Sequence, residues 1–126
     1  MSNSEEDRGA VLIVEDEALV RIDVAWFIKE AGFVVYEAAD ADEAIRLLEK
    51  HRDICLIFTD VQMPGSIDGL KLAHYVRGRW PPIKIIVASG EVMIGHADMP
   101  PGGVFFAKPY RPQLITSKVL EMIGAA

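Results

Sequence analysis

The chain has 126 residues, of which 51% are apolar and 25% are charged, a balance typical of one globular domain with its own core. The formal net charge of −6 argues against nonspecific binding to nucleic acid or to an anionic membrane. No apolar stretch approaches the roughly 20 residues that span a bilayer, and the polar, acidic start of the chain is unlike a secretory signal peptide.

Strand-like and helix-like segments alternate along the chain. Short apolar runs predict strands, and apolar residues at helical spacing predict the helices between them. Asp40 and Glu43 have the spacing of a capping box at the start of the second helix, and Pro81 and Pro82 end the third. The predicted strands are 11–14, 33–36, 54–59, 83–88 and 104–107, and the clear helices are 18–31, 40–50, 68–79 and one from Pro112 to 123.

The stretch between the fourth and fifth predicted strands breaks this rhythm. Residues 91–97 are enough for one or two helical turns, and the prolines and glycines of 98–103 prevent a longer helix. We therefore expect a fourth helix that is shortened, irregular or mobile. The remaining order, strand followed by helix five times, predicts an α/β fold with a parallel sheet covered by helices on both faces.

Cys55 is the single cysteine, so the chain cannot form an internal disulfide or a thiolate zinc cluster. Its place within an apolar run predicts a small residue of the core. With no sign of export, we expect a cytoplasmic protein. We also expect a disordered tail over residues 1–8 and one domain over residues 9–126.

Polar and charged side chains follow four of the five predicted strands. Because the carboxyl ends of parallel strands meet at one edge of the sheet, we expect these side chains to converge there. They are the acidic run 15–17 after the first strand, Asp60 after the third, Ser89 after the fourth and Lys108 after the fifth.

This set of side chains suits phosphoryl chemistry. Clustered carboxylates repel one another and need a hard divalent cation, and Mg²⁺ prefers oxygen ligands of this kind. A carboxylate can also attack phosphorus and form an aspartyl phosphate. The metal and an ammonium group would then neutralise the phosphoryl oxygens in the transition state.

At this point the chain resembles the receiver domain of bacterial two-component response regulators, from about residue 9 to residue 123. The resemblance implies a flavodoxin-like, doubly wound (βα)5 fold with strand order 2-1-3-4-5. Each motif is weak alone, and their order along the chain makes the match specific. The motifs are 11–17 (VLIVEDE), 59–64 (TDVQMP), 68–69 (DG), 88–90 (ASG) and 107–109 (AKP).

The resemblance also implies a metal site. Asp60 matches the phosphoacceptor of the family, and Glu15 and Asp16 match the acidic pair that holds Mg²⁺ together with it. The backbone carbonyl of Gln62, two residues after the phosphoacceptor, matches a further metal ligand. Glu15 stands where Asp is commoner, and we expect its longer side chain still to reach the metal.

Further roles are implied for the switch. Ser89 matches the hydroxyl residue that turns toward the phosphoryl group, and Lys108 matches the lysine that pairs with that group. The bond between Lys108 and Pro109 is typically cis in the family. Phe105 occupies the position of the aromatic side chain that swings inward on activation. The loop after the phosphoacceptor, 63–69, is one residue longer than usual.

These assignments predict a phosphorylatable switch. A histidine kinase or a histidine phosphotransfer protein would supply the phosphoryl group. The switch would then act on an unknown protein target through the 90–110 surface, with a homodimer possible through the 90–123 face.

We expect no direct contact with nucleic acid or membrane. We also expect self-phosphorylation and autodephosphorylation chemistry rather than turnover of an external substrate, with Gln62 and Glu91 setting the lifetime by steering water. Because the chain stops at Ala126, we expect a stand-alone receiver.

Three other interpretations fit parts of this pattern. A receiver-fold interaction module that phosphorylation does not regulate is the main alternative, and the complete acidic set argues against it. A flavodoxin-like cofactor protein needs a phosphate-cradling loop after the first strand, where residues 15–17 would repel phosphate. A hydrolase with an Asp nucleophile needs a second catalytic acid just beyond it, and Gln62 is not one.

Overall fold

The computed structural model describes residues 9–63, 65, 67–90 and 94–124. In this part of the chain, five strands form one parallel sheet in the order β2-β1-β3-β4-β5, which confirms the predicted fold and strand order. The strands are β1 (Ala10–Val14), β2 (Val34–Ala38), β3 (Ile54–Asp60), β4 (Lys84–Ser89) and β5 (Val104–Ala107).

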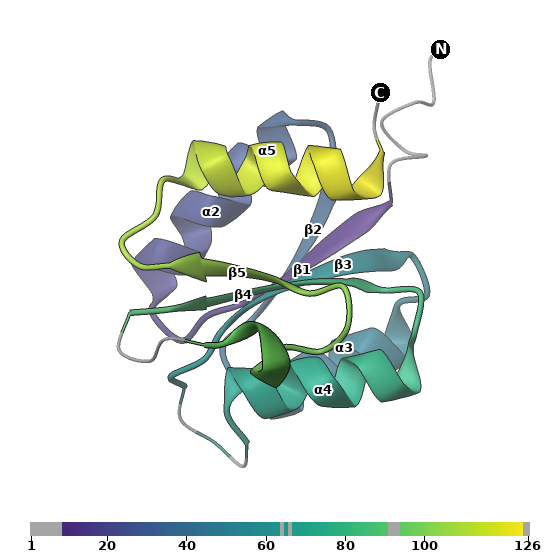
Figure 1. Ribbon diagram of the computed structural model, residues 1–126. Helices are drawn as coiled ribbons and strands as arrows, with labels where there is room; N and C mark the ends of the chain where they lie inside the picture. The colour runs from purple at the N-terminus through teal and green to yellow at the C-terminus, as the bar shows by residue number, and fades with distance from the viewer. Residues whose placement is uncertain (1–8, 64, 66, 91–93, 125–126) are drawn as a thin grey trace.

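Helices cover both faces of the sheet. Helices α2 and α5 lie on one face, and α3 and α4 lie on the other (Figure 1). This arrangement follows from right-handed crossovers between parallel strands. The helices are α2 (Ala18–Glu30), α3 (Ala41–Lys50), α4 (Gly69–Arg79) and α5 (Pro112–Ile123). Among the described residues, no helix has the length and apolar character needed to cross a bilayer.

The core consists of two layers, one on each face of the sheet. Side chains of a strand alternate between faces. Leu12 of β1 therefore packs with Ile57 and Leu72 on the side of α3 and α4, whereas Ile13 packs with Phe58 on the side of α2 and α5. All five residues of β1 are buried, as expected for a central strand of a parallel sheet.

Side-chain caps begin two of the helices. The Asp40 carboxylate accepts a hydrogen bond from the Glu43 amide at 2.8 Å, and the Glu43 carboxylate accepts one from the Ala39 amide at 2.8 Å. The predicted capping box is therefore confirmed, although its return bond reaches the residue before the N-cap. At the start of α4, the Asp68 carboxylate accepts from the Lys71 amide at 2.9 Å.

The second strand lies later than predicted. Residues 33–36 were expected to form it, but β2 runs over Val34–Ala38, and Phe33 packs into the core just before the strand. Strand pairing continues through Glu37 to Ala38, and the Glu37 carboxylate forms an ion pair with Arg21 at 3.1 Å. A charged residue at the end of an apolar run hid this extension.

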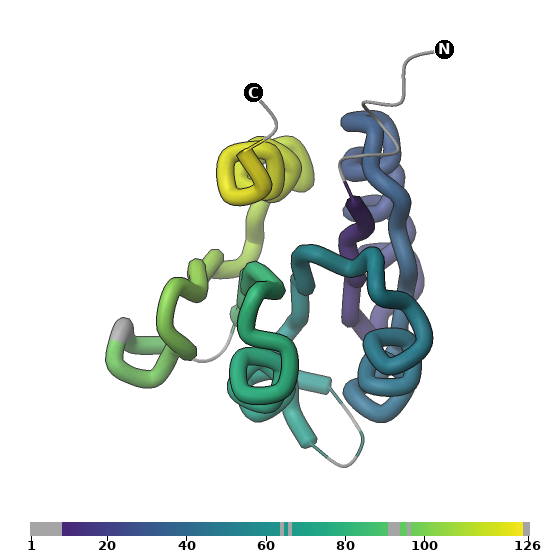
Figure 2. Tube along the Cα trace, turned by 90° about the vertical axis from the view of Figure 1, so that its right-hand side faces the viewer, coloured from purple at the N-terminus to yellow at the C-terminus, as the bar shows by residue number. Residues whose placement is uncertain are grey.

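The connection from β4 to β5 contains no full helix among its described residues. It has a single 3-10 turn, His96–Asp98, so the predicted shortened fourth helix is confirmed there. Residues 91–93 lie outside the described part, and the predicted mobility stays a prediction. Residues 94–103 lie beside α4 (Figure 2). His74 Nε2 lies 2.7 Å from the Asp98 carbonyl oxygen, and Met99 is buried in the core.

Candidate functional site

Three carboxylates meet at the carboxyl edge of the sheet. Glu15 and Asp16 follow β1, and Asp60 ends the neighbouring strand β3, where Val14 pairs with Thr59. One carboxylate oxygen from each of the three acids lies within 4.8 Å of the others. Asp16 is exposed to solvent, whereas Glu15 and Asp60 are only 1% and 2% exposed. The predicted acidic cluster therefore exists, and two of its members are buried.

The Lys108 ammonium reaches into this cluster from the end of β5. Its Nζ lies 2.8 Å from Asp60 Oδ1 and 3.5 Å from Glu15 Oε1. The Lys108 amide donates a hydrogen bond to the Ser89 carbonyl at 2.9 Å, which joins the ends of β4 and β5. The peptide bond between Lys108 and Pro109 is cis, as the resemblance implied.

Burial and charge shift the ionisation of these groups. Burial raises the pKa of Asp60, and the Lys108 ammonium opposes this shift. Burial also raises the pKa of Glu15, and the charge of Asp60 adds to that rise. For Lys108, burial lowers the pKa, but the hydrogen bond and charge of Asp60 outweigh it, so the pKa is raised overall. Among the described residues, Lys108 is the cation that pairs with the buried acids of the cluster, and its single charge does not balance three carboxylates.

The cluster fits a hard divalent cation. Asp60 Oδ1 is buried, and the Lys108 ammonium, 2.8 Å away, balances its charge only in part because Glu15 shares that ammonium. A cation with oxygen ligands would supply the missing positive charge. Asp60, Asp16 and Gln62 line a small cavity of about 230 Å³, together with Glu17, Gly90 and Lys108.

Ser89 and Gln62 are joined by a side-chain hydrogen bond that sequence reasoning did not anticipate. The Ser89 hydroxyl donates to Gln62 Oε1 at 3.0 Å. Ser89 is 2% exposed at the end of β4, and Gln62 is half-buried in the loop after β3. The backbone brings the two together, because the Val61 amide donates to the Ala88 carbonyl at 3.0 Å.

Arg21 is another residue at the site that sequence reasoning missed. Its Nη1 donates to the Glu15 carbonyl oxygen at 2.8 Å, while its Nε pairs with Glu37 at 3.1 Å. The Glu17 amide also donates to Glu15 Oε2 at 3.0 Å. These contacts fix both the backbone and the carboxylate of Glu15. An arginine one turn into a helix carries no sequence signal for this role.

Gly69 holds the loop that follows Asp60. Its amide donates to the Val61 carbonyl at 2.9 Å, and a Cβ added to Gly69 would lie 1.7 Å from the Asp60 carbonyl oxygen. The first residue of α4 therefore packs directly against the backbone of Asp60. The predicted one-residue excess in this loop does not disturb that contact.

Phe105 lies in the middle of β5, opposite Val87 of β4. Its ring is half-buried and packs against the core layer on the α3 and α4 side. This position is compatible with the predicted switch, which stays a prediction. Glu91, which was expected to help set the phosphoryl lifetime, lies outside the described residues.

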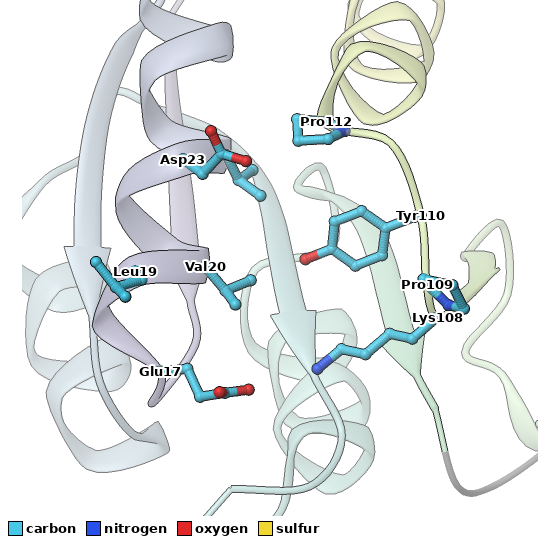
Figure 3. A pocket seen from close by; sticks show the side chains of 9 residues that line it. Glu17, Leu19, Val20, Asp23, Lys108, Pro109, Tyr110 and Pro112 are labelled. Carbon is cyan, nitrogen blue, oxygen red and sulfur yellow. The ribbon is translucent and has the colours of Figure 1, made fainter.

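A larger pocket opens beside Lys108, between the start of α2 and the loop after β5 (Figure 3). Its volume is about 630 Å³, and its lining is mostly apolar. The Tyr110 ring points into it and packs edge-on against Phe58 at 5.6 Å between ring centroids. Burial and the surrounding carboxylates raise the pKa of Tyr110, so its hydroxyl stays protonated. The lining residues are Glu17, Leu19, Val20, Asp23, Val24, Lys108, Pro109, Tyr110 and Pro112.

The raised pKa values of the carboxyl groups predict a pH dependence for the metal-free protein. The ordinary pKa values of Asp60 and Glu15 are 3.8 and 4.5. Because both are raised in the folded state, that state binds protons more tightly than the unfolded chain. The stability that protonation contributes is therefore lost as the pH rises from about 4 through the folded pKa values. The stability that the Lys108 ammonium contributes is constant in this pH range, because it is lost only when the pH rises above the ordinary lysine pKa of 10.5.

We expect the free energy of unfolding to fall less steeply with pH in Asp60→Asn than in the natural chain. Urea denaturation with a chelator present, at a series of pH values from 4 upward, would measure both slopes. Glu121→Gln, on the exposed side of α5, is the matched control and should keep the natural slope. Identical slopes in Asp60→Asn and the natural chain would show that the pKa of Asp60 is not raised in the folded state.

The chain is similar in sequence to two curated proteins over most of its length. It is 41% identical to the transcriptional regulatory protein PdtaR of Mycobacterium tuberculosis over 83 residues, which are 64% of this chain and 40% of that protein. It is 32% identical to the sensor kinase CckA of Brucella abortus over 117 residues, which are 90% of this chain and 12% of that protein. The chain thus spans less than half of the length of either relative.

Solved structures and a family model agree with these matches. The receiver domain of the hybrid histidine kinase CckA superposes with a TM-score of 0.76 at 34% identity, covering 91% of this chain and 99% of that one. A response regulator receiver protein from Sinorhizobium medicae gives a TM-score of 0.84 at 24% identity, covering 93% and 95%, and supports the fold. The model of the response regulator receiver domain matches residues 11–119. The chain therefore belongs to the response regulator receiver domain family.

Proposed function

We propose that this receiver domain accepts a phosphoryl group on Asp60 in a Mg²⁺-dependent reaction. The observation that carries the proposal is the setting of Asp60, a buried carboxylate 2.8 Å from the Lys108 ammonium within a cluster of three acids. A buried carboxylate in such a cluster lowers the stability of the fold, and groups of this kind are typical of functional sites.

The proposed metal ligands are the carboxylates of Glu15, Asp16 and Asp60, with the backbone carbonyl of Gln62. When bound, Mg²⁺ supplies positive charge that offsets the charge of the carboxylates and of the transferring phosphoryl group. Glu15 is held by the Glu17 amide and by Arg21, so this ligand is already oriented. Asp16 is the exposed member of the set and leaves the site open to solvent.

In the proposed reaction, an Asp60 carboxylate oxygen attacks the phosphorus of the donor. The new oxygen–phosphorus bond forms as the phosphorus–nitrogen bond of a donor phosphohistidine breaks, and the imidazole leaves with the electron pair. The Lys108 ammonium, already beside Asp60, would stabilise the charge on the phosphoryl oxygens. Hydrolysis of the acyl phosphate would later restore the carboxylate, so the domain would act as a phosphoacceptor and not as a turnover enzyme on an external substrate.

The proposed donor is a histidine kinase or a histidine phosphotransfer protein. The mostly apolar pocket of about 630 Å³ beside Lys108 offers a donor a surface next to the acceptor. Leu19 is 84% exposed at its edge, an apolar side chain available for contact. We propose that the donor and the domain are both cytoplasmic. We also propose that phosphorylation changes Ser89, Phe105 and the 90–110 surface, which would then bind a protein target or a second copy of the chain.

Phosphorylation can be tested without the natural donor. With Mg²⁺ and acetyl phosphate, intact mass should show the addition of one phosphoryl group to the natural chain and to the control Asp42→Asn, an exposed acid on α3. No addition is expected in Asp60→Asn or when a chelator removes Mg²⁺. Failure of the natural chain to gain the phosphoryl group would favour an interaction module that phosphorylation does not regulate.

A further inference from the structure

The hydrogen bond between Ser89 and Gln62 occupies the hydroxyl that the proposed switch requires. A serine hydroxyl has one proton to donate. Here the hydroxyl donates it to Gln62 Oε1 at 3.0 Å, and Ser89 is almost fully buried. To donate to a phosphoryl oxygen on Asp60, the hydroxyl must first give up Gln62 as its acceptor.

We infer that the Gln62 side chain is a positioning residue that holds Ser89 in its resting orientation and so opposes activation. This inference rests on the proposed function of Asp60. It assigns the side chain of Gln62 a role separate from that of its backbone carbonyl, which is a proposed metal ligand. The loop geometry supports it, because the bond between the Val61 amide and the Ala88 carbonyl keeps the two residues adjacent.

The two acceptors differ in strength, which makes the exchange reversible. Gln62 offers a neutral amide oxygen, whereas a phosphoryl group offers charged oxygens that accept stronger hydrogen bonds. The Ser89 hydroxyl therefore donates to the phosphoryl group when that group is present, and it donates to Gln62 again after hydrolysis. A neutral hydrogen bond of this kind changes an equilibrium by about 2- to 12-fold, so its loss should favour the active orientation by that factor.

A double-mutant cycle tests the inference. The probe is beryllium trifluoride with Mg²⁺, a stable mimic of the phosphoryl group on a carboxylate, and its dissociation constant can be measured by fluorine NMR. The four proteins are the natural chain, Gln62→Met, Ser89→Ala and the double variant. Methionine keeps the length of the glutamine side chain and the backbone carbonyl, but it has no strong acceptor.

We expect Gln62→Met to tighten binding of the probe by about 2- to 12-fold when Ser89 is present. In the Ser89→Ala background the same change should have no effect, because no hydroxyl is left to release. Equal effects in the two backgrounds, or no tightening in the first, would overturn the inference while leaving the proposed function standing. Absence of Mg²⁺-dependent binding to the natural chain would overturn both.

Discussion

Gly69→Ala should destabilise the fold by about 3 kcal/mol, the upper end of what overpacking in a core usually costs. The added Cβ would lie 1.7 Å from the Asp60 carbonyl oxygen and 2.8 Å from Thr59 Oγ1. Because the closer contact is with backbone, the methyl group has no flexible side chain to displace. Either α4 moves away from β3 or the backbone of Asp60 shifts, and the hydrogen bond between the Gly69 amide and the Val61 carbonyl is lost in the process.

The same helix provides a matched control. Gly78 lies in the exposed part of α4, and a Cβ added there meets nothing within 4 Å. Gly78→Ala should therefore stabilise the protein by about 0.5–1 kcal/mol, the usual gain from replacing glycine in a helix interior. Urea denaturation would measure both variants. A Gly69→Ala protein as stable as the natural chain would show that the helix start does not press on Asp60.

Lys108→Ala should slow phosphorylation by acetyl phosphate about 100- to 1,000-fold, the range seen when one preorganised charge-stabilising group is removed from a site. The Lys108 ammonium is 2.8 Å from the carboxylate that receives the phosphoryl group and is only partly exposed, so water replaces it poorly. Its loss also leaves the acidic cluster without a positive side chain at this position. The rate constant can be followed by intact mass at saturating Mg²⁺.

Lys118→Ala is the control for that experiment. Lys118 pairs with Glu121 on the surface of α5 at 3.1 Å, and a surface pair of this kind contributes little. Its removal should leave the phosphorylation rate unchanged. A Lys108→Ala protein that is phosphorylated at the natural rate would mean that the ammonium only balances charge in the resting protein.

Local sequence patterns were sufficient for most of the fold. The apolar runs predicted β1 and β3, which pair at the centre of the sheet and are buried almost throughout. The Asp40 capping box placed the start of α3 correctly, since a cap depends on neighbouring residues only. The strand order came from the family resemblance, because periodicity within one strand says nothing about its neighbours.

The site was predictable only in part. Asp60 and Lys108 could be brought together from the sequence, because each follows a parallel strand and all such strands end at one edge. The hydrogen bond between Gln62 and Ser89 could not, since it joins a loop residue to a strand end 27 residues away and depends on side-chain rotamers. The contact of Arg21 with the Glu15 carbonyl has the same origin. Such details depend on tertiary packing and leave no local pattern.

The identity of the phosphorylated residue is the most direct test of the proposed function. After reaction with Mg²⁺ and acetyl phosphate, borohydride reduces an acyl phosphate to an alcohol, which peptide mass spectrometry can locate. Asp60 should be converted to homoserine, with Asp16 and Glu15 unchanged. A reduced side chain at either of those two positions, with Asp60 intact, would contradict the assignment of Asp60 as phosphoacceptor.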